Sequence, residues 1–244
     1  MKLRFYLALF AGVAMLATVS QAGSLGARVW WASYDVSGSS SQGDQDVDLG
    51  SAPMYLLQLD GSFSERVSGS LMLGVGKGWE YEHLQAGAEQ DISRVDFLAG
   101  LSWQFDYMYI GAAAHAVGVK LDNKWDDGTS STMERVFFGP ELLVGSSFPL
   151  IQDTLLIRGA ASVLPVVGVA ANFDNADGSS ESISTTTWGY SLDGGLVAVL
   201  SNWRLGAGYR LFSIQEYELK YSDGSTEKLT DKFGGPYVMA AVTW

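Results

Sequence analysis

Hydrophobic and polar residues alternate with a period of two along most of this chain. In the segment RVDFLAGLSWQF (94–105), Val95, Phe97 and Trp103 fall on one face, whereas Arg94 and Asp96 fall on the other. The same alternation runs through YLLQLDGSF (55–63), VSGSLMLGV (67–75), WGYSLDGGLVAVL (188–200) and WRLGAGYRL (203–211). Because successive side chains of a strand point to opposite faces, the pattern predicts β-strands rather than helices.

The alternating segments predict ten strands in one domain. We expect them at 26–36, 53–63, 66–77, 92–105, 107–120, 135–148, 154–168, 187–200, 203–217 and 233–244. In 26–36 and 107–120 either face could be the apolar one, and eight strands is the alternative if two weak segments belong to loops.

The connections between these segments alternate in length. Short turns alternate with long polar loops, which we expect at 37–52, 78–91, 121–134, 169–186 and 218–232. Three long loops carry an Asp-Gly tip, at Asp127, Asp177 and Asp223, and glycine accepts the positive φ of a tight turn. Alternating short and long connections are typical of an up-and-down antiparallel meander.

The chain begins with a segment of a different kind, MKLRFYLALFAGVAMLATVSQA. Lys2 and Arg4 precede an apolar run from about Phe5 to Val19, and the small residues Ser20 and Ala22 follow. This order predicts a secretory signal peptide at 1–22 and leaves 23–244 as the mature domain.

Composition narrows the class further. The chain has 244 residues, no cysteine and a net charge of −12. An exported chain without cysteine has no disulfide framework, so its fold must be stabilised by buried area or strand pairing. The acidic balance argues against nucleic acid as a partner, because nucleic-acid binding needs basic patches.

Three features favour a membrane-spanning barrel over a soluble sandwich. Most segments reach the 9–11 residues that a tilted strand needs to cross a bilayer. The less apolar face mixes small residues with scattered charges, which suits a crowded lumen. Aromatic residues gather beside the short turns and again near the long loops, as expected of two membrane interfaces. The first group is Phe63, Trp103, Phe105, Phe148, Trp203 and Trp244, and the second is Trp188, Tyr190 and Phe138, with Trp31 and Trp79 as further candidates.

With its signal peptide, even strand number and aromatic last residue, the chain resembles Gram-negative outer-membrane β-barrel proteins, such as the small porin-like OmpA-, OmpX- and OmpW-like barrels. The resemblance implies an all-β, transmembrane antiparallel up-and-down β-barrel in the outer membrane with periplasmic termini. It implies contact with outer-membrane lipid, lipopolysaccharide and the barrel assembly machinery. The C-terminal residues Val238, Ala240, Val242 and Trp244 match the assembly signal, although Phe is the more usual last residue.

The sequence has few residues that could form a catalytic or metal site. The only histidines are His83, in an expected loop, and His115, in the strand GAAAHAVGV. No spacing fixes a nucleophile or acid partner for either, so we expect no catalytic site, no metal and no cofactor. A barrel-rim enzyme that uses His115 is the least favoured alternative.

Acidic residues crowd the expected long loops. They are Asp44, Asp46, Asp48, Glu80, Glu82, Glu89, Asp91, Asp122, Asp126, Asp127, Asp174, Asp177, Glu181, Asp223, Glu227 and Asp231. They could concentrate cations or form weak divalent sites, or simply keep the loops hydrated. A surface binding or adhesion module that acts through these loops is the main alternative function.

The inward charges lead to the preferred function, a non-enzymatic barrel that is either a narrow porin-like channel or a structural surface barrel. We expect a lumen network or constriction made of Arg94, Asp96, Arg135, Glu141, Arg158, Asp193, Arg204 and Arg210. Opposed charges could plug the barrel or line a narrow path for small cations or solutes. Ten strands lie near the size at which side chains fill the interior.

Overall fold

The protein is an all-β barrel of ten strands. The computed structural model describes residues 22–40, 43–79, 88–125, 128–152 and 154–244. The strands are β1 (Ala22–Ser40), β2 (Gly43–Ser62), β3 (Val67–Trp79), β4 (Ala88–Gln104), β5 (Met108–Trp125), β6 (Ser130–Ile151), β7 (Leu155–Asp174), β8 (Ser180–Leu200), β9 (Trp203–Lys220) and β10 (Thr226–Thr243). Residues 1–21 of the expected signal peptide, and His83, lie outside the described residues.

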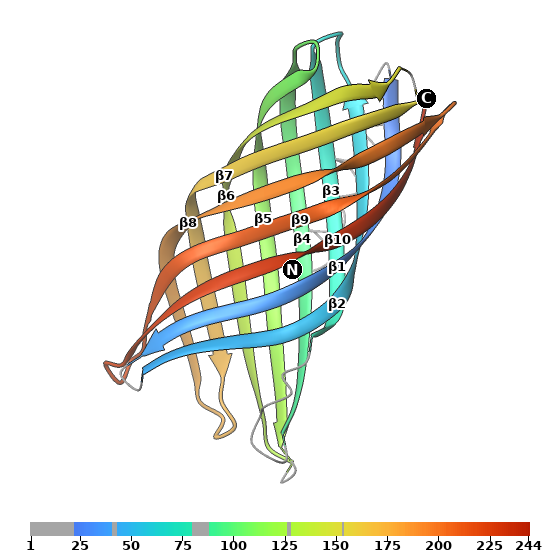
Figure 1. Ribbon diagram of the computed structural model, residues 1–244. Coiled ribbons are helices and arrows are strands. Elements are labelled where there is room, and N and C mark those ends of the chain that lie inside the picture. Colours follow the sequence, from blue (N-terminus) through green and yellow to red (C-terminus); the bar gives the residue numbers. More distant parts are fainter. Residues whose placement is uncertain (1–21, 41–42, 80–87, 126–127, 153) are drawn as a thin grey trace.

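The sheet closes on itself, as the sequence predicts (Figure 1). Each strand pairs antiparallel with its neighbour in sequence, and β1 pairs with β10 from Ser24↔Thr243 to Ser40↔Glu227. The last residue joins this closure, because the backbone N–H groups of Gly23 and Trp244 donate to each other's carbonyls at 3.1 Å. The free edge of the last strand is thereby removed.

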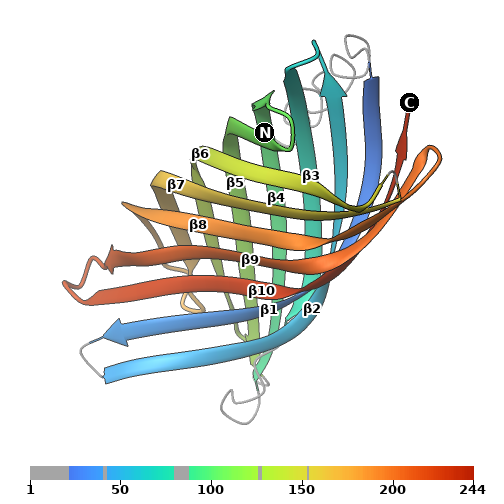
Figure 2. The same ribbon diagram turned by 45° about the horizontal axis from the view of Figure 1, so that its top comes forward.

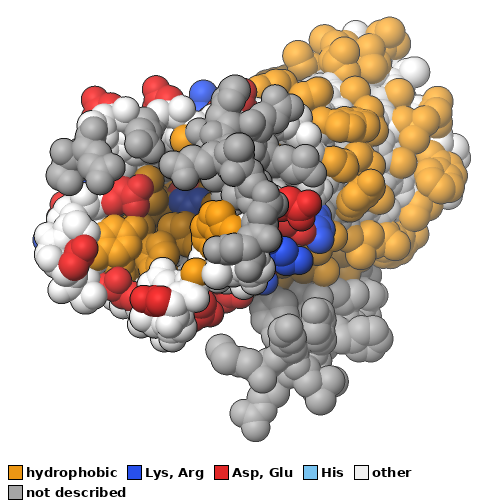
Figure 3. All heavy atoms as spheres, turned by 90° about the horizontal axis from the view of Figure 1, so that it is seen from below, with side chains coloured by type: hydrophobic (Ala, Val, Ile, Leu, Met, Phe, Trp, Pro, Cys, Tyr) orange, Lys and Arg blue, Asp and Glu red, His pale blue; other side chains and the backbone are white. Residues whose placement is uncertain are grey.

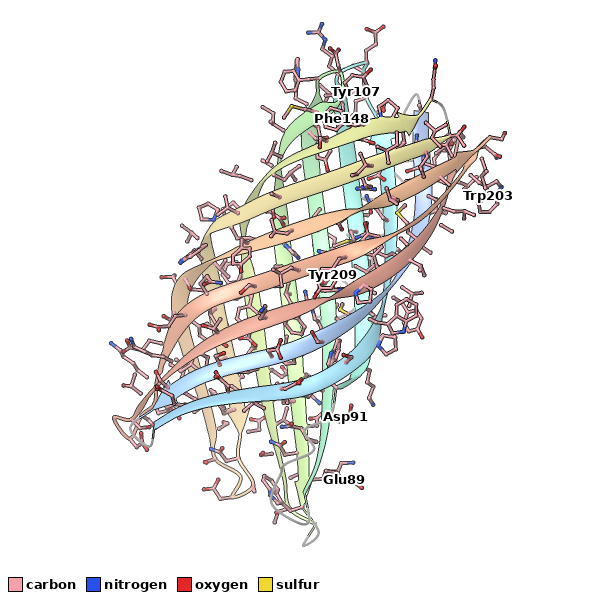
Figure 4. All side chains as sticks on the ribbon, viewed as in Figure 1. Glu89, Asp91, Tyr107, Phe148, Trp203 and Tyr209 are labelled. Atoms are coloured by element: carbon pink, nitrogen blue, oxygen red, sulfur yellow. The ribbon has the colours of Figure 1, made fainter. Side chains whose placement is uncertain are left out.

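The two faces of the strands separate as the alternation indicates. Leu57, Leu101, Leu142 and Leu192 point outward and are about half exposed. Outward aromatic residues form a band at the end with the short turns, where Tyr107, Phe148 and Trp203 project from the wall, and Tyr209 lies farther along it (Figure 4). This face matches the lipid-facing surface of a membrane barrel.

The prediction that Trp79 belongs to an interface band is wrong. Trp79 belongs to neither interface band, because its side chain points into the barrel and is fully buried. Its indole N–H donates to the carbonyl oxygen of Ala32 at 2.7 Å. The positive φ of Gly78 and a register shift between Lys77 and Trp79 turn the indole inward.

The long loops were also predicted wrongly, because most of their residues belong to strands. The segments 43–52, 121–125, 169–174, 180–186 and 218–220 all continue the barrel wall. Many acidic residues assigned to loops therefore lie on strands, namely Asp44, Asp46, Asp48, Glu89, Asp91, Asp122, Asp174, Glu181, Glu227 and Asp231. Glu80, Glu82, Asp126 and Asp127 lie outside the described residues, and Asp177 and Asp223 sit in tight turns.

The Asp-Gly turns themselves form as predicted. Gly178 and Gly224 have φ values of 83° and 86°, which a residue with a Cβ rarely adopts. The carboxylate of Asp177 accepts hydrogen bonds from the hydroxyl and N–H of Ser179, and these two donors hold the pKa of Asp177 below its usual value.

The strands are about twice as long as a bilayer crossing requires, and the excess lies at the end opposite Ala22 and Trp244, here called the loop end. Strands of 17–22 residues are usual in this barrel, against about 9–11 for a spanning strand. The outer wall near the loop end is polar rather than apolar. It carries Ser37, Lys120, Lys124, Glu134, Ser182, Ser184, Lys228 and Lys232. Figure 3 looks at this end, where acidic side chains surround a hollow and the hydrophobic outer wall lies farther back.

Near the loop end, two pairs of neighbouring strands are no longer hydrogen-bonded to each other. Pairing between β8 and β9 stops at Gly189↔Ile214, and pairing between β2 and β3 stops at Met54↔Gly76. The arms of β9, β10, β1 and β2 therefore diverge from those of β4 to β8, as both ribbon views show (Figures 1 and 2). We call the gap between residues 180–188 of β8 and 215–220 of β9 the β8–β9 seam.

Barrel closure predicts that a substitution of Gly235 destabilises the protein, whereas one of Gly118 does not. A Cβ on Gly235 of β10 would lie 1.8 Å from the carbonyl oxygen of Trp31 on β1, whereas a Cβ on Gly118 would meet nothing within 4 Å. Gly235→Ala should lower the free energy of unfolding by about 1–3 kcal/mol or more, because strand β1 has to move. Gly118→Ala is the control.

Urea unfolding of the refolded protein, followed by the heat-modifiable gel shift, measures both variants. Equal stability of Gly235→Ala and Gly118→Ala would contradict the tight β1–β10 contact.

Candidate functional site

The lumen is crossed by stacked layers of charged and aromatic side chains. Charged groups reach it from β1, β4, β5, β6, β7, β8, β9 and β10, because these positions share the inward side of the alternation. The layers are described from the loop end toward the end that carries the short turns and the C-terminus, here called the turn end.

The first layer is an ion pair between Arg135 of β6 and Asp231 of β10, whose Nη1 and Oδ2 atoms lie 3.0 Å apart. Tyr217 of β9 accepts a hydrogen bond from Arg135 at 2.7 Å and donates one to Asp231 at 2.5 Å. Tyr34 of β1 also bonds both charged groups. All four side chains are at most 2% exposed, so the two charges pair inside the protein, while Arg135 Nε has no hydrogen-bond partner among the described residues.

Directly beneath lies a second pair, on one strand. Arg94 and Asp96 of β4 form a two-pronged salt bridge, with Nε–Oδ1 at 2.6 Å and Nη2–Oδ2 at 2.8 Å. The guanidinium carbon lies 3.9 Å from the ring centre of Phe233 and 4.9 Å from that of Phe212. These side chains, from β4, β9 and β10, meet across the whole width of the lumen and are at most 1% exposed.

The third layer holds His115, Glu141 and Arg210. His115 Nδ1 lies 2.7 Å from Glu141 Oε2, and the imidazole ring packs 5.2 Å from Phe212. Neither ring nitrogen of His115 has a partner in hydrogen-bond geometry among the described residues, so the contact with Glu141 is one of distance and charge. Arg210 contacts the sulfur of Met72 at 3.5 Å and faces the carboxylates of Asp96 and Glu141.

The fourth layer centres on Asp193 of β8. Its carboxylate accepts a 2.5 Å hydrogen bond from Arg28 and a 2.8 Å hydrogen bond from Tyr237. The Arg28 guanidinium also lies 4.1 Å from the ring centre of Tyr237. Arg158 lies near the same carboxylate and near the hydroxyl of Tyr109.

Below the fourth layer the lumen opens into a polar cavity at the turn end. The cavity has a volume of about 1170 Å³. Its wall includes Gln58, Asp60, Ser70, Tyr109, Arg158 and Arg204. The described lumen thus consists of an open polar vestibule at the turn end and a filled region beyond it.

All eight charges expected in the lumen point inward, but they do not form one cluster. Six of them, Arg94, Asp96, Arg135, Glu141, Asp193 and Arg210, lie within the filled layers, whereas Arg158 borders the vestibule and Arg204 lies near its mouth. Sequence reasoning missed the partners that satisfy them, above all Asp231, Tyr34, Tyr217 and Tyr237. Asp231 could have been found from the alternation of Leu229, Asp231 and Phe233, which continues that of β10.

Metal and helix signals are absent from the part of the chain that the structure describes. There, no group of three or more His, Cys, Asp or Glu side chains could hold a metal ion. No helix among the same residues is long and apolar enough to span a membrane.

The comparisons with known proteins agree with this architecture. No family model matches the chain, and no curated protein matches it in sequence. The outer membrane protease OmpT from Escherichia coli superposes with a TM-score of 0.66 at 9% identity, over 92% of this chain and 97% of that chain. The translocator domain of the autotransporter NalP from Neisseria meningitidis superposes with a TM-score of 0.52 at 11% identity, over 98% and 94%.

Both similar structures are outer-membrane β-barrels, and this chain shares that fold. Its own barrel is closed and antiparallel and has ten strands. At identities this low the likeness concerns the fold alone.

The buried ion pair of the first layer makes a clear stability prediction. Asp231→Asn removes the charge that faces Arg135, and it should lower the free energy of unfolding by about 3–5 kcal/mol, because an unpaired charge stays buried. Asp91→Asn breaks the exposed pair between Lys77 and Asp91 on the outer wall and should leave stability unchanged.

Urea unfolding of both variants in the same detergent makes the comparison. A cost for Asp231→Asn no larger than that for Asp91→Asn would mean that the first layer is hydrated.

Proposed function

We propose that the protein is a non-enzymatic structural surface barrel of the Gram-negative outer membrane, closed to solutes and active through its loop end. The observation that carries this proposal is the pair of filled layers around Arg135 and Arg94. Their side chains are at most 2% exposed and come from opposite sides of the barrel. A conducting pore would need a continuous water path at this depth, as in barrels wide enough to leave a channel.

The aromatic contacts support closure as strongly as the charges do. Trp30, Phe212 and Phe233 lie around the Arg94 guanidinium, at 5.5, 4.9 and 3.9 Å from ring centre to guanidinium carbon. An entering ion would have to displace this stack and the bonds of the salt bridge together. The porin-like alternative would therefore need a rearranged lumen.

The outer wall supports the membrane placement within this proposal. The exposed apolar belt and its turn-end aromatic band would face lipid, with both termini in the periplasm and the loop end at the cell surface. Lipopolysaccharide and the barrel assembly machinery stay proposed partners. Val238, Ala240, Val242 and Trp244 belong to the outward side of the closing strand β10, or its end, where an assembly signal would be read.

A rim enzyme built on His115 receives no support from the geometry. The imidazole is 2% exposed in the middle of the lumen rather than at the rim. Its acid neighbour Glu141 is in place, but no nucleophile bonds Nε2 among the described side chains. A serine triad needs the nucleophile at that nitrogen.

Planar-bilayer recording tests the closed state. The refolded protein, shown to be folded by its gel shift, should give no conductance steps. The triple variant Arg135→Ala/Asp231→Ala/Phe233→Ala removes both charges together and one ring of the stack, so it should produce steps. The double variant Lys77→Ala/Asp91→Ala, which breaks an outer-wall pair, is the control and should stay silent.

Reproducible, cation-selective steps from the unmodified protein would overturn the closed barrel in favour of the porin-like alternative. Silence of the folded triple variant would show that these two layers alone do not close the lumen.

A further inference from the structure

The β8–β9 seam is a place where two strand edges face each other without pairing. Residues 180–187 of β8 pair with β7 on their other side, residues 217–220 of β9 pair with β10, and no backbone pairing joins these two edges to each other. Unpaired edges present rows of backbone donors and acceptors, and proteins usually cover or blunt them. Here two such edges lie in one wall, with a cavity of about 450 Å³ between them.

Side chains hold the seam in position at both of its ends. At the base, the Thr187 hydroxyl lies 2.9 Å from the carbonyl oxygens of Gln215 and of Glu216. At the tip, the N–H of Ser222 donates to the carboxylate of Glu181 at 2.5 Å. Between these two ties, residues 182–186 of β8 and 217–220 of β9 face each other without backbone hydrogen bonds.

The two sides of the seam differ in chemistry. Toward the barrel interior lie Ile183 and the ring pair Phe173–Tyr221, whose centres are 5.5 Å apart. Toward the outside lie Ser182, Ser184 and the carboxylates of Glu216 and Glu218. Within the described part of the chain, both carboxylates form ion pairs with exposed lysines, Glu216 with Lys228 at 2.9 Å and Glu218 with Lys220 at 3.2 Å. Exposed pairs of this kind are weak and exchange readily with another cation.

We propose that the β8–β9 seam binds an extended polypeptide segment, which adds its backbone to the free edges of β8 and β9. An added strand points alternate side chains to opposite faces, so this site favours a peptide in which apolar and basic residues alternate. The apolar side chains would rest on Ile183 and the Phe173–Tyr221 pair, and the basic ones would meet Glu216 and Glu218. The inference names a ligand class for the loop end and so deepens the proposed function.

The place of the seam on the barrel fits this role. Pairing between β8 and β9 ends beside Trp188, an exposed outward indole on the loop side of the apolar belt. Within lipid every backbone group has to be paired, whereas beyond the belt water or a partner can satisfy it. The edges are thus free only where a peptide from solution can reach them.

Binding of a designed peptide tests the inference. The probe is a five-residue peptide of alternating valine and lysine, the length of the open stretch 182–186 of β8, with a fluorescein at one end, measured by fluorescence anisotropy. The full chain is held in phosphatidylcholine nanodiscs, and empty nanodiscs are the blank. We expect saturable binding that weakens by at least about tenfold when alternate peptide nitrogens are methylated, because backbone hydrogen bonds are lost.

Protein variants locate the site. Glu218→Gln should weaken binding of the valine–lysine peptide severalfold, and an otherwise identical valine–glutamate peptide should bind less well to the unmodified protein. Glu134→Gln, which changes an exposed outward carboxylate on β6, is the matched control and should bind like the unmodified protein. Gel shifts establish that each variant is folded.

Three outcomes would overturn the inference: no binding above empty nanodiscs, equal binding of the methylated peptide, or equal effects of Glu218→Gln and Glu134→Gln. Each of these would leave the closed lumen untouched, because conductance tests closure separately.

Discussion

A charge buried away from water has to meet its partner inside the protein, and this constraint organises the barrel. Arg135 reaches its partners only when β6, β10, β9 and β1 stand in one register, because Asp231, Tyr217 and Tyr34 come from the other three strands. Two of these strands, β1 and β10, also form the pair that closes the sheet. The register that closes the wall therefore also sets the geometry of this layer.

Strand pairing is complete along the apolar belt but not near the loop end, because the two regions have different surroundings. Along the apolar belt each wall strand pairs with both neighbours, as backbone in lipid requires. Beyond the belt the outer wall turns polar, and two pairings stop, beside Trp188 on β8 and near Tyr55 on β2. Water can satisfy an unpaired edge there. The same strand thus serves first as membrane wall and then as a solvated arm with a free edge.

The alternation of apolar and polar residues was sufficient for strand number, strand faces and the inward charges, because these depend on neighbouring positions. It failed for the arms: residues 180–186, for example, read as a loop because serine and threonine dominate them, yet β7 pairs with each. It failed also for Trp79, which the positive φ of Gly78 and a register shift between Lys77 and Trp79 turn inward. Asp231 was assigned to a loop, although it continues the inward alternation of Leu229 and Phe233 in β10. The partners of Arg135 and the β8–β9 seam depend on register around the whole barrel, which no local pattern contains.

Accessibility of the vestibule tests closure of the lumen most directly. The chain has no cysteine, so Ser70→Cys places a single thiol on the vestibule wall, and Ser184→Cys places one on the outer side of the β8 arm. A charged, membrane-impermeant thiol reagent is applied to intact cells and then to cells with a permeabilised outer membrane. The closed barrel predicts labelling of Ser184→Cys in both, but of Ser70→Cys only after permeabilisation. Labelling of Ser70→Cys in intact cells at a rate like that of Ser184→Cys would contradict it.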